Sequence, residues 1–392
     1  MLGGILNPAF LQAAGARKHF PGILLKSEVD DPFIQKISCS GDITVTSIKN
    51  GERIVETYSN LSNATLTISA DAGTPVRIDG TITGVFSGSI EDFTELRIHG
   101  TSITSIDISG ADYLHNVDIR DNTSLTSIKL AYCYNMRNFT QSGNTSLSSI
   151  ELTYCFGIDS LTISDAPALT SLTTTYCFGM HKLNVNNNPL LTSINATNCF
   201  DLAYVNVDGC AALATLTLTS AYDVKSLIFK DNVNLATLIL KTCIHLEELD
   251  VKNCINLSSL DMRYCYEMRE VDLSQNTSLS SLLLAFCNKL TSFELGDNQT
   301  ITTLNLEDCY SLHTLDISKN SSITTLTLTN CYEISTIYAT ATNSSAATAI
   351  ANLITANEAL AGTVYVNSDD TYYSTIETAA QAANWTIEPL PA

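Results

Sequence analysis

The feature that most constrains this chain is an apolar residue that returns every 11 positions. From Ile103 to Ile334, each of these positions holds leucine, isoleucine, valine or methionine. Eight residues after each of them stands a second column, which mainly alternates between cysteine and asparagine. A chain with so short and fixed a period folds as stacked units, in which each unit contacts its neighbours.

The repeating unit reads L-x-x-L-x-L-x-x-(C/N)-x-x, and two units make a period of 22 residues. Ala221 interrupts the cysteine column, and Ala166, Cys210 and Cys254 replace asparagine in the other column. The remaining members are Cys133, Cys155, Cys177, Cys199, Cys243, Cys265, Cys287, Cys309 and Cys331 in one column, and Asn122, Asn144, Asn188, Asn232, Asn276, Asn298 and Asn320 in the other.

The L-x-L part of each unit alternates with a period of two, which is typical of a β-strand. Eleven residues are too few for a strand and an α-helix, so each unit is predicted to be a short strand followed by a tight corner. The predicted fold is mainly β, a solenoid with two parallel sheets around a narrow core. With strands stacked about 4.8 Å apart, the regular part is roughly 50 Å long.

Composition narrows the classes of partner. The net charge is −20, and only 15 % of residues are charged while 45 % are hydrophobic. An acidic chain is a poor match for nucleic acid or for an anionic membrane surface. We therefore expect no nucleic-acid partner and no membrane insertion, since no apolar run approaches the length of a membrane span.

The repeat resembles the leucine-rich repeat family, whose conserved half reads LxxLxLxx(N/C). It is most similar to the bacterial variant that carries this pattern in both halves of a 22-residue repeat, as in residues 246–267 and 312–333. The resemblance covers residues 103–340 and implies that the Asn/Cys position points inward and bonds to neighbouring backbone. Because the helical outer half of ordinary leucine-rich repeats is missing, we expect a straighter and flatter solenoid.

The two columns are expected to be structural. A corner leaves peptide groups that the sheet no longer pairs, and buried ones need partners. A stacked asparagine amide can supply them, and a thiol is small and tolerates burial. We expect reduced, buried thiols, with disulfides between coils and a metal site as alternatives, and no cofactor. Reduced thiols favour assembly in a cytosol, including a bacterial cytoplasm in which phage particles are built.

The two edges differ in sequence. After the asparagine column the residues are small and neutral, whereas after the cysteine column they are aromatic, charged and variable. Such residues on a constant scaffold indicate a binding edge, since Tyr and Arg are favoured at interfaces; capping of the core is the alternative. The candidate binding residues are Tyr134, Arg137, Phe156, Phe178, His181, Phe200, Tyr222, Tyr266, Arg269, Tyr310, His313 and Tyr332.

One sheet is also expected to carry an acidic row of Asp250, Asp272, Glu294 and Asp316. Stacked carboxylates repel unless they are solvated or bridged by a cation. Solvated surface is the main interpretation, and a calcium site or a catalytic carboxylate pair are the alternatives. We expect no enzyme, because no nucleophile motif or phosphate-binding loop is present.

Both ends depart from the repeat. Residues 1–60 are expected to form an N-terminal arm, which docks into a larger assembly through residues 1–32, and a β-hairpin that turns at Asn50-Gly51. Irregular coils are expected from residue 61, regular units from 103, and an α/β cap over 341–392, with helices at 344–362 and within 369–384. This tail resembles the closing segments of leucine-rich-repeat proteins from Bacteroidetes and their phages.

These features favour a non-catalytic structural or binding protein of a phage virion, such as a fibre, spike or capsid accessory protein, with a host surface protein or glycan as a further partner. A bacterial surface or secreted leucine-rich-repeat adhesin or effector is the alternative, and a β-helical glycan-degrading enzyme is a third. The fold alone does not decide between them.

Overall fold

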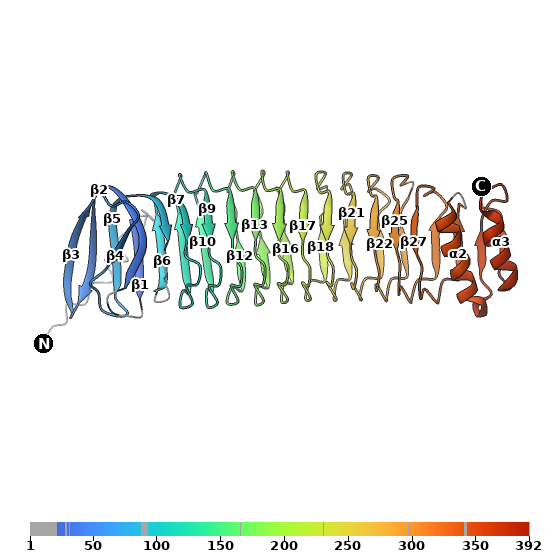
Figure 1. Ribbon diagram of the computed structural model, residues 1–392, viewed down its shortest axis with the longest axis horizontal. Coiled ribbons are helices and arrows are strands. Elements are labelled where there is room, and N and C mark those ends of the chain that lie inside the picture. Colours follow the sequence, from blue (N-terminus) through green and yellow to red (C-terminus); the bar gives the residue numbers. More distant parts are fainter. Residues whose placement is uncertain are drawn as a thin grey trace.

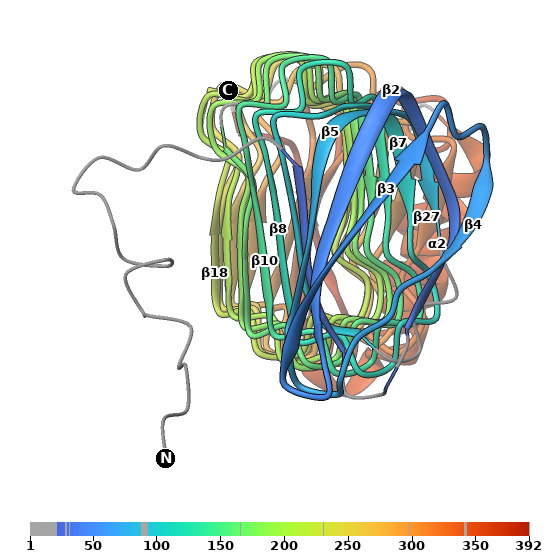
Figure 2. The same cartoon turned by 90° about the vertical axis from the view of Figure 1, so that its left-hand side faces the viewer.

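The computed structural model describes residues 22–27, 30, 32–87, 93–164, 166–229, 231–296, 298–340 and 343–391. In this part of the chain, the coils stack into a straight rod with a small cap at each end (Figure 1). Viewed along the rod, successive coils lie almost on top of one another (Figure 2). The rod is a β-solenoid of about 13 turns with parallel sheets, so the predicted fold class is confirmed.

The Cys-corner sheet contains the strands that lead into the cysteine column. Equivalent residues pair in parallel at a spacing of 22 residues, as Ser149 does with Ser127 and Ser171. The ladder is continuous over β7 (Ser102–Asp107), β9 (Ser127–Lys129), β11 (Ser149–Glu151), β13 (Ser171–Thr173), β15 (Ser193–Asn195), β17 (Thr215–Thr217), β19 (Thr237–Ile239), β21 (Ser259–Asp261), β23 (Ser281–Leu283), β25 (Thr303–Asn305) and β27 (Thr325–Thr327).

The Asn-corner sheet forms the opposite wall, and its strands lead into the asparagine column. Its pairing falls into short runs: β6 to β10, β12 to β16, β18 with β20, β22 with β24, and β26 with β28. The strands are β6 (Phe93–His99), β8 (Asn116–Arg120), β10 (Asn138–Ser142), β12 (Ser160–Thr162), β14 (Lys182–Asn184), β16 (Tyr204–Asn206), β18 (Ser226–Ile228), β20 (Glu248–Asp250), β22 (Glu270–Asp272), β24 (Ser292–Glu294), β26 (Thr314–Ile317) and β28 (Thr336–Ala339).

The narrow core lies between the two sheets. In one unit, Leu125, Ile128, Leu130 and the corner residue Cys133 are all buried, which is the L-x-x-L-x-L-x-x-C pattern of the sequence. Each corner is a tight turn, in which the next apolar residue donates its N–H to the corner carbonyl, as Met136 does to Cys133 over 3.1 Å. The 11-residue period therefore reports one strand and one turn.

The N-terminal cap is more extensive than a hairpin. The predicted hairpin is present as β2 (Phe33–Lys49) and β3 (Glu52–Ser59), joined at Asn50 and Gly51, whose φ angles of 54° and 77° suit a tight hairpin turn. It pairs antiparallel with β4 (Ala64–Thr67) and β5 (Pro75–Ser87). The expectation of coils from residue 61 is therefore wrong for these two strands.

The first strand changes the interpretation of the N-terminal arm. β1 (Gly22–Ser27) pairs antiparallel with both β5 and β6, and it buries Ile23 and Leu25 in the core. Residues 22–27 thus belong to the cap rather than to a free arm. Residues 1–21, which include the predicted short helix after Pro8, lie outside the described residues.

The C-terminal cap replaces the Cys-corner sheet with helices. β28, β29 (Thr363–Tyr365) and β30 (Thr386–Glu388) continue the Asn-corner sheet in parallel, while α2 (Ser344–Ala356) and α3 (Tyr373–Ala382) connect them. The first helix is shorter than predicted: it ends before Asn357 and is followed by a 3₁₀ turn, η1 (Glu358–Leu360). Asn357 donates its amide to the carbonyls of Cys331 and Ile334, over 2.8 and 3.2 Å, which closes the cysteine column.

Candidate binding site at the cysteine corners

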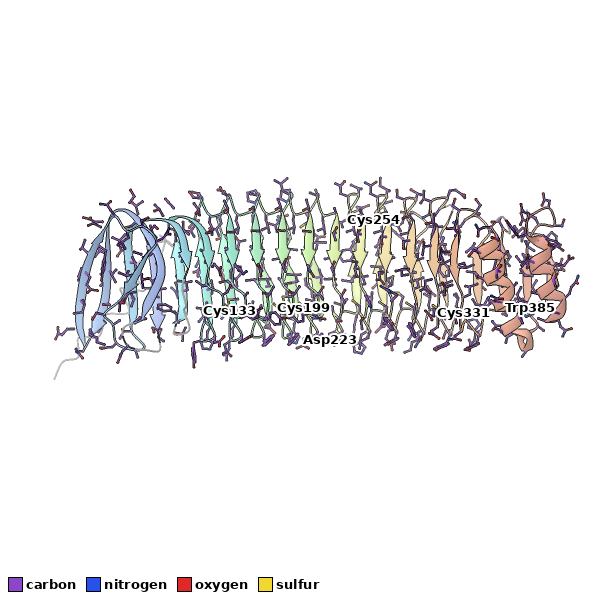
Figure 3. All side chains as sticks on the ribbon, in the orientation of Figure 1. Cys133, Cys199, Asp223, Cys254, Cys331 and Trp385 are labelled. Atoms are coloured by element: carbon purple, nitrogen blue, oxygen red, sulfur yellow. The ribbon has the colours of Figure 1, made fainter. Side chains whose placement is uncertain are left out.

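The cysteine thiols act as hydrogen-bond donors to the preceding coil. Each thiol of the column lies next to the carbonyl oxygen 25 residues earlier, as Cys155 does to Leu130 at 3.0 Å and Cys199 to Thr174 at 2.8 Å. All twelve cysteines of the chain are buried and free. Figure 3 places Cys133, Cys199 and Cys331 along one edge of the rod, and Cys254 on the opposite edge.

Burial makes Cys243, Cys254 and Cys287 poor nucleophiles and metal ligands. Desolvation raises the pKa of Cys243 and Cys287 to about 12, and that of Cys254 to about 11. Because the thiolate is the nucleophile and the metal ligand, a thiol with such a pKa is neither at neutral pH. Within the described residues, no group of three or more His, Cys, Asp or Glu side chains is placed to hold a metal.

The asparagine amides donate in the same way at the other corner. Asn188 donates to the carbonyl of Ile163, 25 residues earlier, over 2.9 Å. Its Oδ1 also accepts the backbone N–H of Ala166, over 3.1 Å. Where Cys210 stands in this column, its thiol takes over the donor role to Val185, over 3.0 Å.

The residue before each cysteine adopts a left-handed backbone conformation. Asparagine or glycine usually occupies such positions, yet here φ is 57° at Tyr154, 65° at Thr242 and 64° at Phe286. At several asparagine corners the same position holds a left-handed residue with a short side chain or none, such as Asp121, Gly143 and Asn187. The sequence analysis did not identify this column, although the repeated Tyr-Cys-Phe-Gly at 154–157 and 176–179 contains it.

Two aromatic ladders therefore run along the cysteine corners. The pre-cysteine ladder contains Tyr132, Tyr154 and Tyr176, with ring centroids 4.9 and 4.5 Å apart. Edge-to-face contacts of 6.2–6.3 Å join it to the second ladder within each coil. The post-cysteine ladder contains Tyr134, Phe156, Phe178, Phe200 and Tyr222, stacked at 4.7–5.0 Å.

The stacking determines which parts of these rings are exposed to a partner. Inside a ladder the ring faces are covered by neighbouring rings, and only the rims face solvent. Phe156 is 36 % exposed and Tyr134 38 %. Beyond the ladders, Tyr266 and Tyr310 are also exposed, and Tyr332 is 53 % exposed. The alternative that the aromatics only cap the core fits their stacking on one another but not this exposure.

The glycines of the repeated motif let the corners approach closely. A Cβ at Gly179 would lie 2.7 Å from the carbonyl oxygen of Phe156, which is too short for any side chain. Gly157 donates its N–H to Tyr134, over 3.0 Å. The motif Tyr-Cys-Phe-Gly thus combines two ladder rings, an inward donor and the space for tight stacking.

The charged candidates on this edge largely pair with one another. His181 lies 2.8 Å from Asp159, and His313 lies 3.2 Å from Glu333. The backbones of Arg137 and Arg269 take part in bonds between coils: Arg137 donates its N–H to His115 over 2.9 Å, and Arg269 accepts the N–H of Thr291 over 2.8 Å. The structure therefore brings aromatic and paired charged side chains together along one edge.

The acidic row belongs to the opposite sheet and largely stabilises turns. The carboxylate of Asp272 accepts bonds from the backbone N–H and the hydroxyl of Ser274, and these bonds lower its pKa. Asp316 makes the same pair of bonds with Ser318, and Asp250 accepts from the N–H of Lys252. Glu294 is exposed. A carboxylate that accepts a bond from the backbone N–H two residues later is thus a recurring feature of the corners in this fold.

The neutral residues near the asparagine corners also have a role. In the segments that lead into the Cys-corner sheet, one hydroxyl in most coils donates to the carbonyl 22 residues earlier, as Ser148 does to Thr126 and Thr170 to Ser148; alanine stands at this position in two coils, as Ala214 and Ala236. This edge is not uniformly small, because Val233 and Ile255 are 45 % and 48 % exposed. The sequence prediction of a small, neutral edge is therefore wrong in the middle of the rod.

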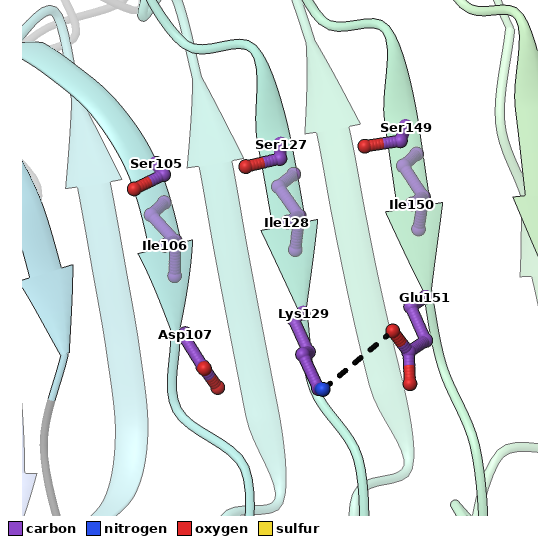
Figure 4. A pocket seen from close by; sticks show the side chains of 9 residues that line it. All are labelled: Ser105, Ile106, Asp107, Ser127, Ile128, Lys129, Ser149, Ile150 and Glu151. Carbon is purple, nitrogen blue, oxygen red and sulfur yellow. Dashed lines mark ion pairs between the residues drawn. The ribbon is translucent and has the colours of Figure 1, made fainter.

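The best-formed hollow lies on the outer face of β7, β9 and β11 (Figure 4). It is shallow and open, with a row of serines on one side and an ion pair of Lys129 and Glu151, at 3.8 Å, on the other. Ile106, Ile128 and Ile150 of its lining are buried, whereas Asp107 and Lys129 are exposed.

Comparison with known proteins was made on the whole chain. No family model, no curated protein and no solved structure matches it. The leucine-rich-repeat resemblance therefore remains a hypothesis based on the repeat pattern. In the described part of the chain, neither helix is long and apolar enough to cross a membrane.

Proposed function

We propose that this protein is a non-catalytic binding protein whose rod displays the cysteine-corner edge to a protein partner. The observation that carries the proposal is the pair of aromatic ladders, whose exposed rims are held at fixed intervals on a hydrogen-bonded scaffold. Aromatic side chains held in this way lose little conformational entropy when they bind, which favours recognition.

We further propose that the rod is a component of a phage virion, such as a fibre, spike or accessory protein. Three observations support this: the straight, capped rod, the reduced thiols and the high negative charge. Because β1 is part of the cap, the assembly arm in this proposal is limited to residues 1–21 rather than 1–32.

The test uses purified particles made with tagged protein. The full chain should be incorporated, whereas a chain lacking residues 1–21 should stay soluble and be left out of the particle, as measured by quantitative mass spectrometry. A variant with Phe156, Phe178 and Phe200 each replaced by alanine should be incorporated but attach less well to host cells. Absence of the full chain from particles would refute the virion proposal, and unchanged attachment of the variant would refute the binding edge.

A further inference from the structure

The aromatic ladders begin abruptly, and their first rings have an open face. The register of 22 residues places Gly110 below Tyr132 and Asp112 below Tyr134, so neither ladder has a ring at the equivalent position of the preceding coil, whose exposed Tyr113 belongs to neither column. The coils are in contact there, because Gly110 donates its N–H to Ala131 over 2.7 Å. Tyr132 is 48 % exposed, the largest exposure of any ring in the two ladders.

The chain contains a second place where a ring of the pre-cysteine column has no ring before it. At Tyr264 the preceding position is Thr242, and the open side is covered by a cation: the ammonium of Lys241 lies 5.9 Å from the ring centroid. Lys182 covers Tyr204 in the same way, at 5.2 Å. Positive charge over an aromatic face is a favourable arrangement.

At Tyr132 the residue equivalent to Lys241 is Ser109. Its short hydroxyl is bound to the carboxylate of Asp107, over 2.8 Å, and cannot reach over the ring. Among the described residues, no lysine or arginine covers the face of Tyr132. Tyr132 thus lacks the cation that covers the open face of Tyr264.

The neighbouring residues suit a cation from outside. Gly110 leaves open space, since a Cβ there would have no atom within 4 Å. The exposed Asp112 stands beside this space, and its backbone is fixed by bonds to Gly110, at 3.0 Å, and from the side-chain amide of Asn135, at 2.8 Å. The faces of Tyr132 and Tyr134 and the carboxylate of Asp112 therefore border the space that precedes the first rings of the ladders.

We propose that this step, formed by Gly110, Asp112, Tyr132 and Tyr134, binds an arginine side chain of the protein partner. The guanidinium stacks on the tyrosine face as the next rung of the ladder, and its N–H groups pair with the carboxylate of Asp112. Arginine fits better than lysine because its flat group both stacks and bonds in a bidentate manner. The inference rests on the proposed binding edge and names the chemistry of its partner.

The test is fluorescence anisotropy with a short fluorescein-labelled peptide that contains two arginines. A matched peptide with lysine in place of arginine should bind more weakly. A matched peptide with citrulline, whose side chain is flat but uncharged, should bind more weakly still. Tyr132→Ala and Asp112→Asn should each lower affinity about three- to five-fold. Ser109→Lys should do the same without removing any ring, because the new ammonium occupies the site as Lys241 does at Tyr264.

Matched controls separate this site from general attraction to an acidic protein. Asp201→Asn removes one carboxylate elsewhere on the same edge, and Tyr264→Ala removes a ring that is already covered; neither should change affinity. Equal effects of Asp201→Asn and Asp112→Asn, or full binding by Ser109→Lys, would overturn the proposal. The host-attachment measurement with the phenylalanine variant is independent, so the binding edge can stand if the arginine site fails.

Discussion

The two edges of the rod solve one backbone problem with different side chains. At both edges, an inward side chain donates to the carbonyl 25 residues earlier, a thiol at Cys177 and an amide at Asn188. The Asn188 amide oxygen also accepts the backbone N–H of Ala166, 22 residues earlier, and a backbone bond from Ala221 at the same spacing partly offsets the rise in the pKa of Cys243. The outer residues then differ freely, because the inner bond does not depend on them. A constant scaffold can therefore carry one edge with aromatic ladders and one edge without them.

The largest expected effect is a loss of stability at alkaline pH, which comes from the buried thiols. Cys243, Cys287 and Cys331 have a folded-state pKa of about 12, raised mainly by burial, while an exposed thiol ionises at about 8.5. A raised pKa means that this stability is complete below pH 8.5 and is lost as the pH rises toward 12. At pH 9.5 each such thiol should lower the free energy of unfolding by about 1.4 kcal/mol, and the losses from several thiols add together.

The measurement is the urea midpoint of unfolding between pH 7 and 9.5. Cys254→Asn places the usual residue of its column at that site. It should therefore reduce the loss of stability at alkaline pH while leaving stability at pH 7 nearly unchanged. A midpoint that does not move with pH would show that the thiols are not shielded from ionisation.

The next effect compares the two corner donors directly. Asn188→Leu should lower the free energy of unfolding by about 3 kcal/mol, because it orphans the buried N–H of Ala166 and several carbonyls. Cys177→Ala should cost less, about 1–2 kcal/mol, since one thiol bond and a small volume are lost. Chemical denaturation of both variants checks the order, and equal losses would contradict the distinction between the corners.

The smallest effect concerns the left-handed column. Thr242→Gly should raise stability by about 0.5–1 kcal/mol, because glycine relieves a left-handed β-branched residue that belongs to no ladder. Tyr154→Gly should not, since it also removes two stacked contacts, at 4.9 and 4.5 Å. Thermal unfolding of the pair is the measurement, and stabilisation by both changes would mean that the ladder adds nothing to the fold.

The repeat in the sequence was sufficient to predict the solenoid and the inward columns, and the Asn50-Gly51 turn was sufficient to predict the hairpin. It could not show the antiparallel pairing of β1 with β5 and β6, because contacts between distant segments leave no period. The left-handed conformation of Tyr154 was hidden for another reason: aromatic residues rarely adopt it, so propensity argues against it. The turn bonds of the acidic row could not be predicted, because a carboxylate such as Asp272 looks the same in sequence whether it is solvated, binds a cation or accepts bonds from a turn.

One consequence concerns the direction in which the rod is built. The thiols of the column, the Asn188 amide and the hydroxyl of Ser148 all donate to the coil that precedes them in the chain. A coil that follows in the chain therefore brings side-chain donors to carbonyls that the preceding coil already holds. Backbone N–H groups also donate in the other direction, since Ala166 donates to Asn188 and Gly110 donates to Ala131. Loss of C-terminal coils thus leaves backbone donors without partners, whereas loss of N-terminal coils leaves the inward thiols and amides without their acceptors. The inward side chains alone give the stack a direction, and it runs with the order of synthesis.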